Sequence, residues 1–469
     1  MLFSSLTFLT IFLPSVIVLY YSVRSLKVRN FILLLFSLVF YAWGEPVYIV
    51  LMILTVTINF YTTILFDKLK KQSKNKTALI VFTLTMVLDL FVLGFFKYAN
   101  FIFSNLGLLF AIDLPEMSLR LPIGISFYTF QLMSYVIDAY RDDVKVQRKL
   151  YLLLTYVSFF PQLIAGPIVR YSTIEEEIEN RSESWELFNS GFQRFIIGLG
   201  KKVIIANNVA IAANYVFSQL SLDNMTFTMA WLGIVGYTLQ IYFDFSAYSD
   251  MAIGLGKMFG FHFLENFNYP YIADSITDFW RRWHMSLSTW FRDYVYIPLG
   301  GNRVKKSRWI FNIFVVWLLT GLWHGASWNF VLWGVYFGVI LIIEKFVISK
   351  YLLKIGPLKY VYTLLLVMIS WVLFNSNSYE QIFTILRKMV SLSDGIDITS
   401  IKNARLLYLW PYFIMGLLGS TPIVKRVLVY LKENALLHGI YLLFLSIILY
   451  MSLMFLISNS YNPFIYFRF

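Results

Sequence analysis

Long runs of apolar residues, separated by short polar turns, make up most of this chain. The first run covers residues 6–23 and ends at a basic turn, and the next two cover residues 31–43 and 47–66, on either side of a Gly-Glu-Pro break. Runs of about 17–25 residues have the length that crosses a bilayer as an α-helix. The pattern predicts an all-α polytopic membrane protein with about eleven transmembrane helices.

Two apolar segments are too short or too broken to cross a membrane. Residues 98–111 follow a spanning run at residues 78–96 and are expected to form a separate segment at the membrane interface. Residues 158–171 are apolar but are interrupted by Pro161, Gly166 and Pro167. Irregular backbone at membrane depth is tolerated only where protein or water covers it, which favours a re-entrant segment here.

Composition agrees with a membrane protein and narrows the chemistry. The 469 residues are 59% hydrophobic and 14% charged, whereas soluble domains are about 25% charged. There is no cysteine, so disulfides, thiolate metal ligands and cysteine nucleophiles are excluded. The net charge of +13 comes from Lys and Arg clustered between apolar runs, which is typical of cytoplasmic loops rather than of a nucleic-acid surface. The lysine-rich turn at residues 67–77 is therefore predicted to face the cytoplasm, and Glu45 the outside.

No internal repeat, low-complexity tract or long linker divides the chain. A single integral membrane domain over residues 1–469 is the simplest organisation. The common nucleotide-binding, metalloprotease and serine-hydrolase motifs are absent. Because neither central histidine has further ligands at metal-binding spacing, we expect no metal site and no tightly bound cofactor.

Candidate chemistry is concentrated in residues 278–333, which hold two of the four histidines, His284 and His324. His324 is the one titratable group in the apolar run of residues 309–332. A titratable group at membrane depth is costly and suggests a functional site, although a lone histidine on an apolar helix can also be a packing residue. Apolar surroundings disfavour imidazolium, so a neutral ring able to act as a base is expected.

Helical spacing places three residues on one stripe with His324, namely Trp317, Thr320 and Trp328. Gly321 and Gly325 beside this stripe would allow another backbone or a ligand to approach closely. The stripe is predicted to form the wall of a tunnel, with ordinary helix packing as the alternative.

A second polar face lies in the apolar run at residues 226–261, where Gln240 and Asp244 are separated by one helical turn. Asp244 is expected to pair with Lys or Arg or to face water, because a lone carboxylate in an apolar helix is costly. Such a pair could hold helices together or take part in the chemistry, and the sequence leaves both open.

The segment before the second histidine is strongly basic. Arg281, Arg282 and Arg303, with Asp278 beside them, are compatible with binding the phosphates of coenzyme A. The same charge is also explained by the excess of Lys and Arg in cytoplasmic loops. These residues are therefore candidate donor-binding groups with a topological alternative.

Two long motifs resemble the core of the membrane-bound O-acyltransferase (MBOAT) family, ENFNYPYIADSITDFWRRWHMSLSTWFRDYVYIPLGGNR and TGLWHGASWNFVLWGVYFG. They are similar to the bacterial branch that contains membrane subunits for alginate and peptidoglycan O-acetylation and for teichoic acid D-alanylation. FYAWGEP, FPQLIAGPIVRY and QIYFDFSAYSDMAIGLG resemble the same branch and occur in the same order, as does the terminal NPFIYFRF. The resemblance covers most of residues 1–345, with the core motifs in residues 121–345, and is weak from 345 to about 432.

The resemblance implies an acyltransferase in which His324, in the WHG-type motif, is catalytic and His284 occupies the second family position. It also implies a cytoplasmic acyl donor, a central tunnel and an extracytoplasmic acceptor. Both imidazoles are expected to line that tunnel, about 10–20 Å apart from the rise of the intervening helix.

The function expected from this resemblance is transfer of acetyl groups from acetyl-CoA across the cytoplasmic membrane of a bacterium, for O-acetylation of an envelope polysaccharide. Peptidoglycan is the preferred acceptor because the Ile/Lys/Asn-rich composition suits an AT-rich genome, with alginate O-acetylation and teichoic acid D-alanylation as alternatives. The expected partners are acetyl-CoA, an extracytoplasmic polysaccharide O-acetyltransferase and the lipid bilayer, and not nucleic acid. A transporter or flippase without acyl-transfer chemistry is the alternative from another class.

Overall fold

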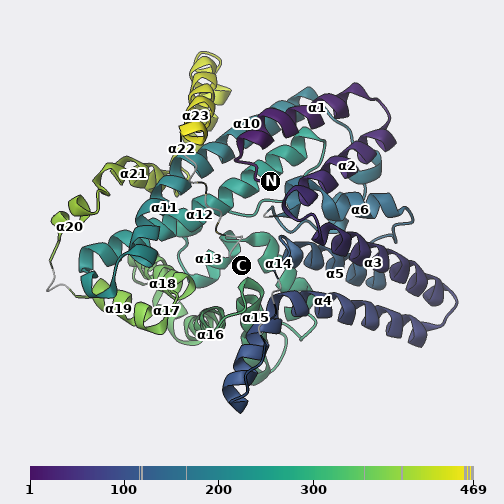
Figure 1. The fold of residues 1–469 in the computed structure, drawn as a ribbon, viewed down its shortest axis with the longest axis horizontal. Helices are drawn as coiled ribbons and strands as arrows, with labels where there is room; N and C mark the ends of the chain where they lie inside the picture. The colour runs from purple at the N-terminus through teal and green to yellow at the C-terminus, as the bar shows by residue number, and fades with distance from the viewer. Residues whose placement is uncertain are drawn as a thin grey trace. The chain divides into compact units, whose positions relative to one another are not determined.

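The computed structural model describes residues 1–115, 117, 120–164, 166–352, 354–391, 395–458, 462 and 465. These ranges form helices and connecting loops, and they contain no strand (Figure 1). By length and composition, seven of the described helices could cross a membrane. The bent pair Leu407–Gly419 and Ile423–Glu433 makes an eighth if it forms one span. The all-α polytopic fold is therefore confirmed.

The predicted count of about eleven includes apolar helices that are shorter than a full span. Phe8–Ser22 is one of these, and α5 (Ile125–Arg141) has 17 residues. The described residues of the predicted re-entrant stretch at residues 158–171 include the short buried helix α7 (Phe160–Leu163), which has four residues.

The expectation of a separate interfacial segment at residues 98–111 is wrong. Helix α4 (Asn75–Phe110) is continuous over 36 residues and includes both this segment and the preceding apolar run. No proline interrupts residues 75–110, and an isolated glycine such as Gly94 is tolerated inside a helix. Hydrophobic length alone therefore does not reveal where a helix ends.

The described chain forms two compact units. The first contains residues 1–195 and 249–264. In this unit α3, α4 and α5 lie side by side (Figure 1), and the rings of Phe82 on α4 and Tyr140 on α5 stack at 4.3 Å. Its helices are α1 (Leu13–Ser22), α2 (Leu26–Gly44), α3 (Tyr48–Lys71), α4 and α5, α6 (Leu150–Ser158), α7, α8 (Tyr171–Ile174), α9 (Glu177–Asn180) and the first part of α10 (Trp185–Gly200).

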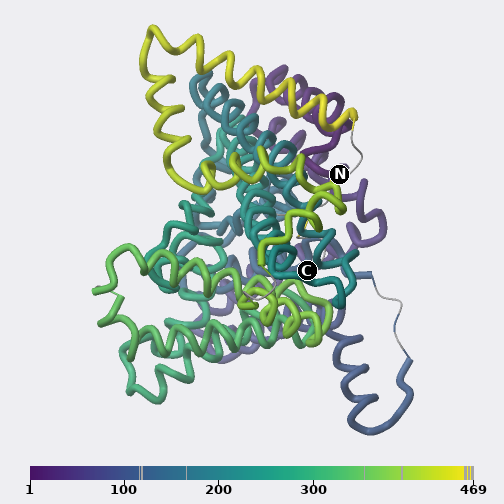
Figure 2. Tube along the Cα trace, turned by 90° about the vertical axis from the view of Figure 1, so that its left-hand side faces the viewer, coloured from purple at the N-terminus to yellow at the C-terminus, as the bar shows by residue number. Residues whose placement is uncertain are grey.

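The second unit contains residues 196–248 and the described residues from 265 onward, and it holds both histidines of interest. Large aromatic side chains such as Trp317, Trp333 and Trp371 form its core. Figure 2 shows α22 and α23 as neighbouring yellow helices. The helices of this unit are α11 (Asn207–Asn214), α12 (Phe227–Met258, as far as residue 248), α13 (Ile276–Arg282), α14 (Met285–Phe291), α15 (Lys306–His324), α16 (Trp328–Ile343), α17 (Ser349–Leu352), α18 (Leu358–Asn375), α19 (Tyr379–Met389), α20 (Ile398–Asn403), α21 (Trp410–Gly419), α22 (Ile423–Glu433) and α23 (His438–Ser458).

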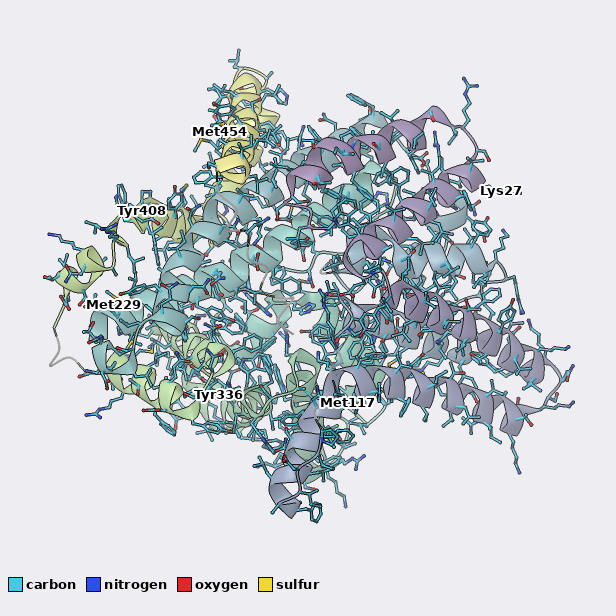
Figure 3. The ribbon with its side chains drawn as sticks, in the orientation of Figure 1. Lys27, Met117, Met229, Tyr336, Tyr408 and Met454 are labelled. Carbon is cyan, nitrogen blue, oxygen red and sulfur yellow. The ribbon has the colours of Figure 1, made fainter. Side chains whose placement is uncertain are left out.

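Exposed side chains on the spanning helices are largely apolar. On α4, Leu84, Val87 and Phe91 are all exposed, and Tyr408 and Met454, both labelled in Figure 3, are exposed in the second unit. In water such surfaces would be an aggregation hazard, whereas hydrocarbon solvates them. The chain is therefore a multi-pass membrane protein.

Candidate active site

His324 is the last residue of α15. The helix ends there because the backbone becomes extended at Gly325 and again at Ser327, before α16 begins. The imidazole is 4% exposed, and its ring meets Trp333 of α16 and Phe374 of α18 edge-on at 5.0 and 5.3 Å. Three helices thus surround His324 with aromatic side chains, which favours the neutral ring over imidazolium.

The predicted stripe beside His324 is correct for two residues and wrong for the third. Trp317 and Thr320 are buried on α15, about two turns and one turn before the histidine, respectively. Trp328 is 52% exposed and starts α16, because α15 has already ended four residues earlier. The aromatic neighbour at the histidine is Trp333 instead.

Gly321 has the role that its position predicted. A Cβ built on Gly321 would lie 3.3 Å from the Cα of Gly334 on α16, so the two antiparallel helices touch through their glycines. Small residues at such a crossing let helix backbones approach closely. This contact sets the position of the helix end that carries His324.

His284 precedes α14 and is held in a strained conformation. Its backbone has φ 44° and ψ 53°, the left-handed region that a residue with a Cβ rarely adopts. The side chain is 1% exposed, and its ring meets Phe245 of α12 edge-on at 4.6 Å. The strain places the imidazole inside the second unit instead of at its surface.

Asn266 fixes the orientation and tautomer of His284. Its Oδ1 accepts from the backbone N–H of Ser286 at 3.1 Å and from the Ser286 hydroxyl at 2.9 Å, and it lies 3.2 Å from Nδ1 of His284. A backbone N–H can only donate, so this Asn266 atom is the oxygen, and the His284 tautomer with its proton on Nδ1 matches it, with Ser286 Oγ also 3.4 Å from Nδ1. The lone pair is therefore on Nε2, which makes Nε2 the basic atom of His284.

Burial lowers the pKa of His284 well below its usual range, and the nearby His324 lowers it further. Removing water disfavours the charged ring, and a second histidine adds repulsion once either ring is protonated. At neutral pH His284 is therefore a neutral imidazole.

The two histidines are brought close to each other through Trp323. The Trp323 ring lies 5.9 Å from the His284 ring and 5.1 Å from the His324 ring, so the two imidazole centroids are at most about 11 Å apart. Only the lowest part of the predicted range of about 10–20 Å is compatible with this limit. The run between the histidines does not separate them, because the start of α14 and the end of α15 converge.

The predicted basic residues are in two different situations. Arg282 donates to Asp278 at 2.8 Å within α13, so this pair neutralises itself. Arg281 and Arg303 are both exposed. Of the predicted donor-binding residues, these two present charge to the surroundings.

Glu344 holds α13 from its N-terminal end, a contact that sequence reasoning missed. Its carboxylate accepts from the backbone N–H groups of Ile276 and Thr277 at 2.7 and 3.0 Å, and from the Thr277 hydroxyl at 2.7 Å. The first N–H groups of a helix have no partner within the helix, and a carboxylate also favours the positive end of its dipole. Glu344 thereby fixes the helix that leads into His284.

Asp244 is paired, as expected from its cost in an apolar helix. Lys202 Nζ lies 2.6 Å from Asp244 Oδ1, both side chains are buried, and Asp244 also accepts from the backbone N–H of Ile465 at 2.8 Å. Gln240 is buried one turn earlier on α12. Asp244 is therefore tied to structural partners, and it is Phe245 of α12 that touches His284. The rest of the terminal NPFIYFRF motif, apart from Asn462 and Ile465, lies outside the described residues.

Fold and site together define a helical membrane protein with two buried histidines close to each other. The model of the MBOAT, membrane-bound O-acyltransferase family, matches residues 73–374, and the chain belongs to this family. Probable alginate O-acetylase AlgI of Azotobacter vinelandii is 41% identical, over 89% of this chain and 85% of the relative.

Two further relatives show the breadth of the similarity. Probable alginate O-acetylase AlgI of Pseudomonas putida is 38% identical over the whole of both chains. Peptidoglycan O-acetyltransferase of Helicobacter pylori is 34% identical, over 79% of this chain and 75% of the relative. The chain is an acyltransferase, and the family predicted from its motifs is confirmed.

The residues missed by sequence reasoning are those that hold the histidines. Asn266 lies in the ENFNYPY stretch of the first motif. The motif could be recognised in the sequence, but the contact of Asn266 with His284 could not. Trp323, adjacent to His324 in the chain, contacts both rings. The role of Glu344 could not be predicted from its neighbours in the sequence, because its hydrogen-bond partners are more than sixty residues earlier in the chain.

Proposed function

We propose that this protein moves acetyl groups from cytoplasmic acetyl-CoA across the membrane for O-acetylation of an envelope polysaccharide. The observation that carries this proposal is the pair of buried histidines whose rings both contact Trp323. Aromatic side chains surround His324, and Asn266 orients His284 so that Nε2 is its basic atom. Acyl transfer to a hydroxyl needs a neutral base and exclusion of water, and the site provides both.

The reaction divides between the residues as follows. A ring nitrogen of His324 accepts the proton of the attacking hydroxyl as the new C–O bond forms at the acyl carbonyl. The C–S bond of the thioester then breaks, and the proton goes to the departing thiolate, so atoms and charge balance. Nε2 of His284, turned away from Asn266, is placed to accept or relay a proton in the same site. Arg281 and Arg303 are candidate partners for the CoA phosphates.

The polysaccharide acceptor rests on the relatives. Two relatives named as probable alginate O-acetylases are 38–41% identical to this chain over 85–100% of their own length. They support alginate or another exported polysaccharide as the acceptor. The peptidoglycan O-acetyltransferase relative, at 34% identity, supports the acceptor predicted from composition. An extracytoplasmic O-acetyltransferase would complete delivery to either polymer, from the outer face of a bacterial cytoplasmic membrane.

The test is acetyl release from radiolabelled acetyl-CoA by the purified protein, with an acceptor polysaccharide or with water. The wild type should consume the thioester, and His324→Ala should lower the rate about 100-fold or more, as expected for loss of a general base. His262→Ala is the matched control, because His262 is exposed and pairs with Glu177 in the first unit.

Intact acetyl-CoA with the wild type would overturn the proposal in favour of a transporter or flippase. A near-normal rate with a folded His324→Ala protein would overturn the catalytic assignment. Ester-linked acetate on alginate or on peptidoglycan, measured after co-expression with the partner transferase, would separate the two acceptors.

A further inference from the structure

The helices α3, α4 and α5 of the first unit bury polar stripes against one another. Only five positions of α4 are buried, and three of these are polar: Thr85, Asp89 and Lys97. Helices in a membrane usually bury small or apolar residues, so this arrangement is unusual. We call the buried polar residues of these helices the polar seam: Thr55, Asn59 and Thr63 of α3, the three residues of α4, and Ser126, Tyr128, Thr129, Gln131, Ser134, Tyr135 and Asp138 of α5.

Hydrogen bonds fix the order of these groups along the helices. Near one end, Lys97 Nζ donates to Ser126 Oγ at 3.1 Å. In the middle, Asn59 Nδ2 donates to Asp89 Oδ1 at 2.8 Å, and Asn59 is halfway along the 24 residues of α3. At the opposite end, Lys70 Nζ donates to the backbone carbonyl of Tyr140 at 2.9 Å. The seam therefore runs along the length of the helices, with Asp89 near its centre.

Several atoms of the seam have unused hydrogen-bonding capacity. Asp89 Oδ2, Asn59 Oδ1, Thr63 Oγ1, the Tyr128 hydroxyl and both amide atoms of Gln131 are buried, and no described residue pairs with them. If the seam served only to hold helices together, leaving so many polar atoms unsatisfied would be costly. Water molecules in the seam, and protons that move between them and the side chains, would supply hydrogen-bond partners for all of these atoms.

Asp89 has no cation beside it to stabilise a negative charge. Its hydrogen-bond partner in the described structure is the neutral amide of Asn59. Lys97, on the same helix, is eight residues away, about 12 Å by helix rise. The titratable groups on the helices packed against α4 are Tyr48, Tyr61, Asp67, Lys68, Lys70 and Lys71 of α3, and Tyr128, Tyr135, Asp138, Tyr140 and Arg141 of α5. A carboxylate in such surroundings has no compensating charge, which is costly at membrane depth.

We propose that the polar seam is a proton-transfer path across the membrane, in which Asp89 holds the proton midway. Polar groups recur one or two helical turns apart along each helix, roughly 5–12 Å, gaps that one or two waters with two hydrogen bonds each can bridge. In the proposed reaction His324 returns the proton of the attacking hydroxyl to the departing thiolate, so this path carries protons independently of acyl transfer.

The proposal is tested with the full-length protein in liposomes that enclose a pH-sensitive dye. A potassium diffusion potential, negative inside and set with valinomycin, drives protons inward. The wild type should acidify the interior several-fold faster than protein-free liposomes, and Asp89→Asn should reduce the rate to the protein-free level. Asp223→Asn, at an exposed carboxylate of the second unit, should match the wild type. Because no acetyl-CoA is present, the result is independent of the acyltransferase assignment.

Equal rates for wild type and protein-free liposomes, or wild-type flux in Asp89→Asn, would overturn the path. A second measurement decides if that variant does not fold. Dicyclohexylcarbodiimide adds to a protonated carboxyl group in apolar surroundings, so mass spectrometry of the wild type should find the adduct on the peptide containing Asp89, with proton flux lost in proportion. No adduct on that peptide, or full flux after labelling, would contradict the proposal.

Discussion

The two histidines of the site are held in different ways, and this difference assigns them different chemistry. Asn266 holds His284 by a hydrogen bond that leaves one basic atom, Nε2, whereas aromatic edges surround His324. A hydrogen bond to a ring nitrogen selects a tautomer, but an aromatic edge does not. His284 is thus fixed in orientation and proton position, and the aromatic contacts restrict only the position of the His324 ring.

Replacing Asn266 tests its role as a positioning residue. In Asn266→Ala, the Ser286 N–H loses its acceptor and the His284 tautomer is no longer selected, so stability should fall by about 1–3 kcal/mol and acetyl transfer should fall with it. Asn266→Asp keeps an acceptor but adds a negative charge, which raises the pKa of His284. The acid limb of the pH–rate profile should therefore move to higher pH in Asn266→Asp, whereas a purely structural role would leave its position unchanged.

The lowered pKa of His284 also makes stability depend on pH. The unfolded ring binds a proton below about pH 6.5, and the buried ring does so only at lower pH, so the unfolded state holds more protons between these values. The free energy of unfolding should fall as pH falls below about 6.5, by at most about 1.4 kcal/mol per pH unit from this group. Melting temperatures between pH 5 and 8 should show this slope reduced in His284→Gln. An unchanged slope in that variant would assign the effect to other groups.

Among the secondary-structure elements, the α15–α16 pair could be largely predicted from sequence. The apolar run, the two glycines and the burial of Trp317 and Thr320 follow from composition and the period of 3.6 residues. The end of α15 at His324 does not, because a periodic pattern can continue through a helix end, and Trp328 was misplaced for that reason. Asn266 and Glu344 could not be found locally either, since tertiary packing brings them to the residues they hold.

The glycine contact between α15 and α16 gives a test with an internal control. In Gly321→Ala the new methyl group would meet the backbone of Phe330 and Gly334, so α15 must shift, at a cost of about 1–3 kcal/mol, and carry His324 with it. Gly338→Ala places a methyl group 3.4 Å from the Phe314 ring, an ordinary contact, and should be tolerated. Thermal unfolding and acetyl-CoA turnover of both variants check this. Equal stability and equal acetyl-CoA turnover of the two variants would show that the close approach at Gly321 does not matter for function.

For the molecule as a whole, membrane sidedness follows from charge and from the continuous helix α4. The lysine-rich turn at residues 67–77 precedes α4 and is predicted to be cytoplasmic. The 36 residues of α4, if straight, rise about 54 Å, well beyond the roughly 30 Å of a hydrocarbon core, so we predict that its two ends emerge on opposite sides. The loop after α4 is then predicted to be on the outer side.

The absence of cysteine makes this sidedness directly measurable. Gln72→Cys, in the turn before α4, and Asp113→Cys, in the loop after it, are both at exposed positions. A membrane-impermeant maleimide should label the first in inside-out vesicles and the second in right-side-out vesicles or intact cells, with the wild type as the unlabelled control. Labelling of both from one side would contradict a spanning α4. Labelling of Gln72→Cys from the outside would show that the topology is the reverse of the predicted one. It would contradict the proposal that acetyl-CoA binds from the cytoplasm.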